Sequence, residues 1–112
     1  MYKLTVVYGL PTDPHAFDRH YRDVHVPLAK QIPGLAHWTI TKCDPGPDGS
    51  PASSYLVAEL WGKDRASLLG AFATPEGVAA AQDVSRFADG GAQFLYGEEQ
   101  VVTTSAAFWT DR

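Results

Sequence analysis

An aromatic and histidine series near the start of the chain limits the fold more than any other feature of the sequence. Phe17, Tyr21 and His25 recur at intervals of four residues, and Pro27-Leu28 follows them. With about 100° of twist per residue, a helix gathers the large side chains on one face and carries His25 just inside the edge of that face. The predicted members of this buried face are Phe17, Tyr21, Val24, Leu28 and Ile32. The pattern therefore predicts an amphipathic helix that turns a histidine toward an apolar interior.

Both ends of this helix carry recognisable signals. Asp13 supplies an N-cap carboxylate, and Pro14 suits the first helical position because its missing N–H is not needed there. The helix is predicted to run to about Gln31, where Pro33-Gly34 ends it. Pro27 lies inside it and removes one backbone hydrogen bond, so the last turns are expected to bend.

The remaining segments alternate between strand and helix patterns. The predicted strands are residues 2–8, 35–43, 54–61 and 93–104, the last with a bulge at Gly97. A second helical region begins at Asp64, restarts at Thr74-Pro75 and ends at Gly90-Gly91. The predicted fold is therefore α+β: a ferredoxin-like β-α-β-β-α-β order with an antiparallel sheet and helices on one face.

The two faces of the predicted sheet differ in character. The face expected under the helices carries Leu4, Val6, Tyr8, Trp38, Ile40, Leu56, Ala58 and Leu60. The opposite face is expected to carry Val7, Tyr55, Val57 and Trp61 among polar residues. Lys3 and Glu59 also fall on this face, on neighbouring strands, where they can neutralise each other. Because such a face needs a cover, the sequence predicts a homodimer that buries sheet against sheet.

Composition excludes several functional classes. The net charge is −4 and the basic residues are scattered, which disfavours nucleic acid and anionic membrane surfaces as partners. No apolar run approaches the ~20 residues that a membrane span requires. Cys43 is the single cysteine, so no intrachain disulfide forms. These features favour a cytoplasmic protein.

The length of 112 residues fits one domain, predicted over residues 1–104. Residues 105–112 form a short tail that is polar apart from Phe108 and Trp109. Two aromatic rings are hard to explain on a free tail, so we expect them to dock on a partner subunit.

Two segments resemble the EthD family. The first is Phe17-x3-Tyr21-x3-His25-x-Pro27-Leu28 followed by Pro33-Gly34-Leu35. The second is Thr74-Pro75-Glu76-Gly77 followed by Asp83-x3-Phe87. The resemblance implies a dimeric α+β barrel, a superfamily that includes cofactor-free isomerases, cyclases and monooxygenases as well as haem-degrading enzymes. EthD proteins themselves are linked to ether-degradation gene clusters.

His25 is the leading candidate for chemistry, because an imidazole donates or accepts a proton near neutral pH. The alternative is that His25 only caps the bent helix. Tyr21 either orients His25 and holds a substrate oxygen, or is an ordinary core residue. Asp83 either pairs with His25 across a pocket or is a surface or capping carboxylate. His20 is expected to face solvent on the outer side of the helix.

No metal site is expected, because histidines spaced by five residues spread around an α-helix. The leading hypothesis is a cofactor-free homodimeric enzyme that transfers a proton on a small hydrophobic, oxygenated ring compound. The expected pocket walls are Tyr8, Phe17, Leu28, Trp38, Leu60, Phe72 and Phe87. A non-catalytic protein that binds a hydrophobic metabolite is the first alternative. A haem protein with His25 as the axial ligand is the second.

Overall fold

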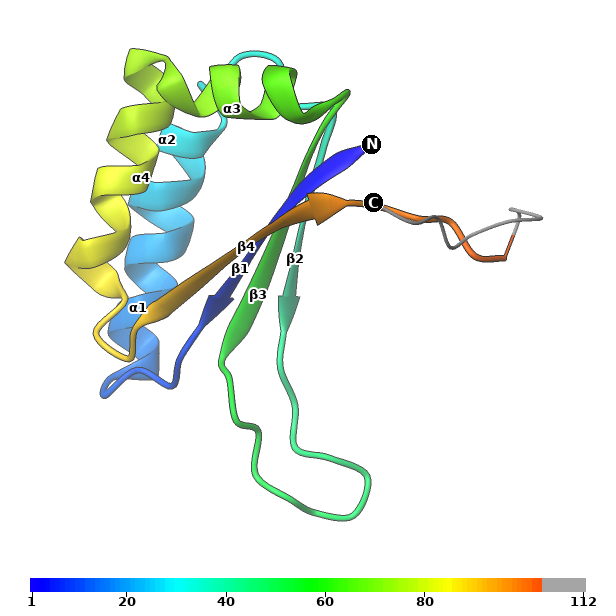
Figure 1. Ribbon diagram of the computed structural model, residues 1–112. Coiled ribbons are helices and arrows are strands. Elements are labelled where there is room, and N and C mark those ends of the chain that lie inside the picture. Colours follow the sequence, from blue (N-terminus) through cyan, green and yellow to red (C-terminus); the bar gives the residue numbers. More distant parts are fainter. Residues whose placement is uncertain (104–112) are drawn as a thin grey trace.

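A computed structural model describes residues 1–103 of the chain, with a four-stranded sheet and helices packed on one of its faces (Figure 1). The strands are β1 (Tyr2–Tyr8), β2 (His37–Lys42), β3 (Leu56–Gly62) and β4 (Ala92–Glu98). The helices are α1 (Pro14–His20), the π-helix η1 (Tyr21–His25), α2 (Val26–Ala29), α3 (Arg65–Ala73) and α4 (Pro75–Phe87). The predicted tail at residues 105–112 lies outside the described residues.

The strand order is β2-β3-β1-β4, and every neighbouring pair is antiparallel. This arrangement confirms the predicted ferredoxin-like fold. β4 is shorter than predicted because its partner β1 begins at Tyr2, which pairs with Glu98, so later residues have no strand to join. The bulge predicted at Gly97 is wrong, since Gly97 pairs directly with Lys3.

Capping explains where the helices begin. The Asp13 carboxylate accepts a hydrogen bond from the Ala16 N–H, as the sequence predicts. Asp64 caps α3 and Thr74 caps α4 in the same way. α4 ends before the turn at Gly91, whose φ of 91° is the left-handed conformation that glycine adopts without strain.

The first helical segment differs from the predicted regular helix. Within η1 the turn is widened, and the Val26 N–H donates to the carbonyl of Tyr21, five residues earlier. A widened turn breaks the assumed twist of about 100° per residue. Val24, predicted to be buried, is therefore 41% exposed, and Ala29 takes the inner position at 3% exposure. This π-turn ends two residues before Pro27, where the sequence predicts a bend.

The sheet faces are largely as predicted. The buried core on the helix side contains Leu4, Val6, Tyr8, Leu56, Ala58 and Leu60. Ile40 faces the same way but is 49% exposed, because β2 is an edge strand. Tyr55 was placed on the wrong side: its ring packs on Phe17 with a centroid distance of 4.9 Å. The Lys3–Glu59 ion pair is confirmed, with Nζ 2.8 Å from Oε2.

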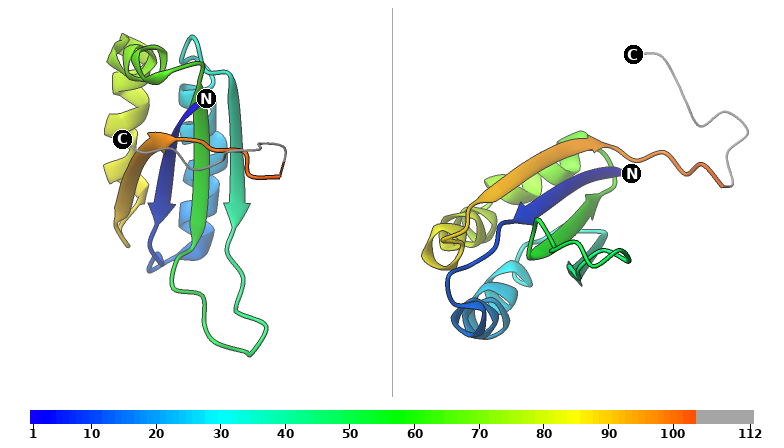
Figure 2. Two further views of the ribbon diagram at one scale, coloured as in Figure 1. Left: turned by 45° about the vertical axis from the view of Figure 1, so that its right-hand side comes forward. Right: turned by 90° about the horizontal axis from the view of Figure 1, so that it is seen from below.

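Figure 2 shows that all helices lie on one side of the sheet and leave the other side uncovered. Val7, Val57 and Trp61 are only half-buried, as expected for apolar residues on an uncovered face. The helical layer and the covered face enclose the core, and the polar residues inside that core define the site described next.

Candidate functional site

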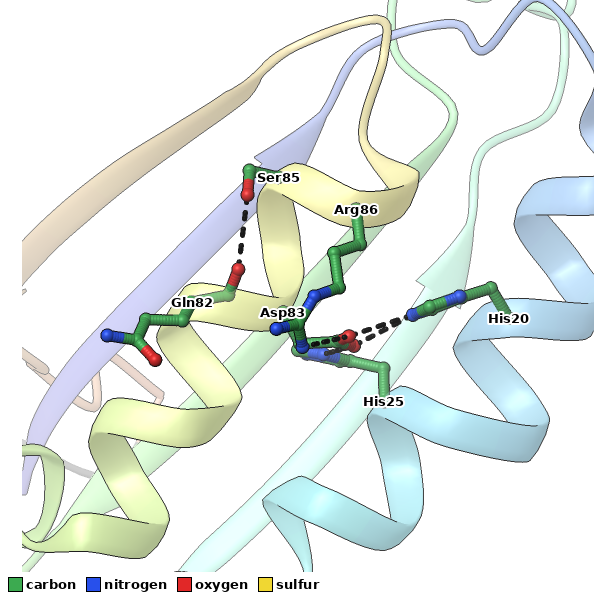
Figure 3. A network of polar contacts seen from close by, with 6 residues as sticks. All are labelled: His20, His25, Gln82, Asp83, Ser85 and Arg86. Carbon is green, nitrogen blue, oxygen red and sulfur yellow. Dashed lines mark hydrogen bonds and ion pairs between the residues drawn. The ribbon is translucent and has the colours of Figure 1, made fainter.

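A buried carboxylate lies at the centre of the site. Asp83 on α4 is 0% exposed, and its Oδ2 lies 3.0 Å from Nδ1 of His25. Nε2 of His20 lies 2.9 Å from Oδ1 of the same carboxylate. Arg86, one turn further along α4, is at 3.4 Å from Oδ1. Figure 3 shows both imidazoles reaching from the first helical segment toward Asp83.

The ionisation states follow from this geometry. Burial raises the pKa of Asp83, but the hydrogen bonds from His20 and His25 outweigh it and hold the pKa below its usual range. Burial lowers the pKa of His25 more than the Asp83 carboxylate raises it, so His25 is neutral at pH 7. An ionised carboxylate only accepts hydrogen bonds. The proton of His25 therefore sits on Nδ1, and Nε2 keeps a free lone pair.

Aromatic packing fixes the orientation of the His25 ring. The ring of Tyr21 lies 5.1 Å from it and that of Phe87 lies 4.9 Å from it, centroid to centroid. Both neighbours are buried. Because the imidazole is held on two sides and bonded through Nδ1, it has little freedom to rotate.

His25 forms part of the wall of a cavity of about 100 Å³ between the sheet and the helices. Its lining is almost wholly apolar and comprises Leu4, Val6, Tyr8, Tyr21, His25, Ala29, Ile32, Trp38, Ala58, Leu60, Phe72, Ala80, Ala81, Val84, Phe94 and Tyr96. Phe94 and Tyr96, on the edge strand β4, are 43% and 53% exposed.

Two phenols share this cavity with His25. Burial raises the pKa of Tyr21 well above its usual value. Burial also raises the pKa of Tyr8, and the nearby Tyr21 and Asp83 raise it further. Both hydroxyls therefore stay protonated near neutral pH and can donate a hydrogen bond. The Tyr21 hydroxyl and the Trp38 indole nitrogen are buried and have no hydrogen-bond partner among the described residues.

The sequence matches a known protein family. The sequence model of the EthD domain matches residues 10–91, from before α1 to after α4. The chain belongs to the EthD family. His20, His25 and Asp83 all fall inside the matched segment.

The similar EthD proteins leave the reaction open. An uncharacterized 11.0 kDa protein in the thcB-thcC intergenic region of Rhodococcus erythropolis is 47% identical, over 91% of this chain and 98% of that protein. The crystal structure of an ethyl tert-butyl ether d (EthD) family protein from Bacillus halodurans is 38% identical, with a TM-score of 0.83. That alignment covers 88% of this chain and 98% of the other.

More distant structures share the fold alone. SnoaB, a cofactor-independent oxygenase from Streptomyces nogalater, is 13% identical with a TM-score of 0.64, over 93% of this chain and 97% of that one. A hydroxynitrile lyase from Passiflora edulis is 17% identical with a TM-score of 0.65, over 86% of this chain and 91% of that one. The EthD fold of this chain is thus similar to those of an oxygenase and a lyase.

The structure brings part of the predicted pocket together. Tyr8, Trp38, Leu60 and Phe72 line the cavity. The other three expected wall residues, Phe17, Leu28 and Phe87, do not. Phe17 and Phe87 pack edge to face, 5.1 Å apart, in an aromatic cluster. Leu28 is turned off the inner face by the π-turn and is half-buried.

His20 is the main residue that sequence reasoning misplaced. It was expected to face solvent, yet its side chain is only 26% exposed and bonds to Asp83. The alternative interpretation of Asp83 as a surface or capping carboxylate is also wrong, because the carboxylate is fully buried. His20 and His25 are five residues apart, the spacing of a π-turn. This spacing is the feature of the sequence that could have indicated that both histidines bond to Asp83.

Two other features bear on function. The described residues contain no cluster of three or more His, Cys, Asp or Glu side chains suited to a metal ion. Within the same part of the chain, every helix is too short or too polar to cross a bilayer.

Proposed function

We propose that this EthD protein is a homodimeric, cofactor-free enzyme that transfers a proton on a small hydrophobic, oxygenated ring compound. The reaction class is isomerisation, dehydration or decarboxylation. His25 is the acid–base residue, Asp83 positions it, and Tyr21 assists by holding the substrate. The cavity lined by Tyr8, Trp38, Leu60 and Phe72 binds the compound.

One observation carries this proposal: an imidazole whose Nδ1 lies 3.0 Å from a buried carboxylate forms part of an apolar cavity wall. A carboxylate behind an imidazole fixes its tautomer and stabilises the cation formed when Nε2 takes a proton. Exclusion of water strengthens the electrostatic interaction between the imidazole and the carboxylate. The pKa of His25, lowered by burial, keeps the ring in its basic form at neutral pH.

The fold supports the same class of chemistry. A cofactor-independent oxygenase and a hydroxynitrile lyase share this fold. The first name describes a reaction that needs no cofactor, and the second describes the cleavage of a bond. At such low identity the neighbours supply precedent for the scaffold and no residue roles. The argument for this chain therefore rests on its own His25 and Asp83.

The proposal includes a dimer because one sheet face has no cover. Val57 on the central strand β3 and Val7 on β1 lie opposite each other on that face. An apolar sheet face of this kind on a monomer usually marks an interface. A second copy of the same face is the simplest cover that also satisfies the closed symmetry of most oligomers.

The test measures proton transfer directly. A panel of small cyclic ketones, beginning with cyclohexanone, is incubated with the protein in D₂O, and exchange at the α-carbon is followed by ¹H NMR. We expect His25→Gln to lower the enzymatic rate about 10²–10⁴-fold. His15→Gln is the matched control, because His15 is exposed and outside the site. Equal rates in wild type and a folded His25→Gln protein would contradict the assignment.

A second candidate function is non-catalytic binding of a hydrophobic metabolite. The observation in its favour is that Tyr21 and Trp38 offer unpartnered polar atoms, which a bound ligand satisfies without any reaction. Ligand affinity that is flat between pH 5 and 8, with no exchange at any carbon, would favour this function. Haem binding is less well supported, because about 100 Å³ is well below the ~300–1,000 Å³ of typical pockets for larger ligands.

A further inference from the structure

Trp38 and Tyr21 come from different parts of the fold, line one cavity, and each carry one unpaired buried polar atom. Trp38 lies on the edge strand β2 and Tyr21 begins the π-helix η1. The indole Nε1 and the phenol oxygen are both closed off from solvent and bond to no described residue. Both side chains line the same cavity as His25.

Unpaired buried polar atoms are rare in folded proteins, because each one loses its hydrogen bonds to water without replacement. Two of them on side chains that line the same, mostly apolar cavity are harder to ascribe to chance. Leu or Phe at either position would have avoided the penalty. The pair is therefore best explained by a ligand that supplies the missing partner.

The chemistry of the two atoms restricts that ligand. An indole N–H only donates, so its partner must be an acceptor. The phenol of Tyr21 is protonated and donates as well. The cavity of about 100 Å³ is of the same order as the ~150 Å³ cavity that holds benzene in a protein core, so the ligand is a single small ring or a chain of similar size.

We infer that Trp38 and Tyr21 bind the acceptor oxygen of a small carbonyl compound in this cavity. The inference deepens the proposed function and rests on the same site, since it names the substrate class. Trp38 becomes the residue that selects oxygenated compounds over hydrocarbons of the same shape. Tyr21 shares that role and lies next to His25.

With a carbonyl compound in the cavity, every proton and electron pair of the proposed transfer can be accounted for. Nε2 of His25 removes a proton from the carbon beside the carbonyl. The electron pair of that C–H bond forms a C=C bond, and the carbonyl π-pair moves to the oxygen to give an enolate. Hydrogen bonds to an oxygen that gains charge strengthen in the transition state. His25 then returns the proton to the same carbon, which regenerates the ketone, or, where a second C=C bond is conjugated with the enolate, to the γ-carbon, which moves the double bond.

The test compares two probes of similar shape: cyclohexanone and methylenecyclohexane, in which a CH₂ group replaces the carbonyl oxygen. Binding is measured by NMR titration of the ¹⁵N-labelled protein. We expect cyclohexanone, and not methylenecyclohexane, to shift the Trp38 indole N–H signal. Trp38→Phe should weaken cyclohexanone binding about two- to tenfold, the usual effect of one neutral hydrogen bond, and leave the hydrocarbon unaffected. Tyr21→Phe should act in the same direction.

The matched control is Trp61→Phe, because the Trp61 indole already bonds to Glu99 and lies outside the cavity. Equal affinity of the two probes for wild type, or no binding of cyclohexanone at all, would overturn the inference. So would a Trp38→Phe protein that keeps the full preference for the ketone.

The binding and exchange experiments together distinguish a failure of this inference from a failure of the proposed function. Ketone-selective binding that depends on Trp38, together with exchange rates unaffected by His25→Gln, would uphold the carbonyl site and refute catalysis by His25. Loss of exchange in His25→Gln without any ketone preference would uphold the proton transfer and refute the role of Trp38. Proton exchange in H₂O leaves cyclohexanone chemically unchanged, so its binding can be measured whatever the exchange rate.

Discussion

The Nδ1 atom of His25 lies 3.0 Å from Oδ2 of Asp83, across the boundary between the first helical segment and α4. The two residues are separated by 58 positions in the chain, and the carboxylate is fully buried. The same carboxylate also accepts a bond from His20. One acidic side chain therefore organises two imidazoles, and only the His25 ring borders the cavity.

Asp83→Asn tests how much this carboxylate contributes. An amide of the same shape offers one acceptor oxygen in place of two, so one of the two histidines loses its partner. We expect the free energy of unfolding to fall by about 1–3 kcal/mol, measured by urea denaturation. In ¹⁵N NMR spectra, His25 should no longer be fixed with its proton on Nδ1.

Asp23→Asn is the control for this substitution, because Asp23 is exposed and bonds only to the neighbouring Arg22 among the described residues. Its unfolding free energy should stay within about 0.5 kcal/mol of wild type. A loss for Asp83→Asn no larger than this would mean that the buried carboxylate does not stabilise the fold.

The stability of the protein should depend on pH through His25. Burial lowers the pKa of His25 in the folded state below the usual value of about 6.5. The unfolded chain therefore binds more protons in this range, and stability rises with pH. The stabilisation is fully present above about pH 6.5 and decreases as the pH falls toward the folded-state pKa.

Urea midpoints between pH 5 and 8 measure this dependence. His25→Gln should flatten the slope, and His15→Gln should keep it. The pKa of Asp83 is also lowered, from an ordinary value of 3.8, so loss of its ionised form falls below this pH range and does not interfere. A slope that survives His25→Gln unchanged would assign the dependence to another group.

The sequence predicted the order of the elements because the relevant signals are local. Asp13-Pro14, Asp64 and Thr74-Pro75 each mark a helix start within a few residues, and all three caps form. The alternation of β1 and β3 was enough to predict the Lys3–Glu59 pair, since side chains alternate strictly between the faces of a strand.

The site was predicted less well because its geometry depends on contacts distant in the chain. The π-turn at η1 changes the helical phase, so Val24 moves outward. No local pattern encodes the bond between His20 and Asp83, which are 63 residues apart. The cavity shape likewise depends on which aromatic rings pack together and which leave space, as Phe17 and Phe87 illustrate.

Val57→Lys tests the proposed dimer. Val57 lies on the central strand β3, on the face that no helix covers. A lysine there would bury an uncompensated charge in a sheet-to-sheet interface, which is strongly unfavourable. We expect wild type to be a dimer and Val57→Lys a folded monomer by light scattering. Val78→Lys, on the exposed surface of α4, should remain dimeric. A monomeric wild type would refute the dimer.

The π-turn predicts an unusual tolerance to deletion. The inner residues of the first helical segment are Phe17, Tyr21, His25, Ala29 and Ile32, spaced by four, four, four and three positions. Removal of the exposed Val24 changes these spacings to four, three, four and three, the pattern of a regular α-helix. The same side chains then face the core without a widened turn.

We therefore expect the protein that lacks Val24 to fold, with an unfolding free energy within about 2 kcal/mol of wild type by urea denaturation. Removal of Gln82, an exposed residue of the regular helix α4, is the matched control. That deletion rotates Asp83 and Phe87 away from Ala80 by about 100°, because α4 has no widened turn to absorb the change. It should prevent folding or cost more than about 4 kcal/mol. Equal damage from the two deletions would mean that η1 does not accommodate an extra residue.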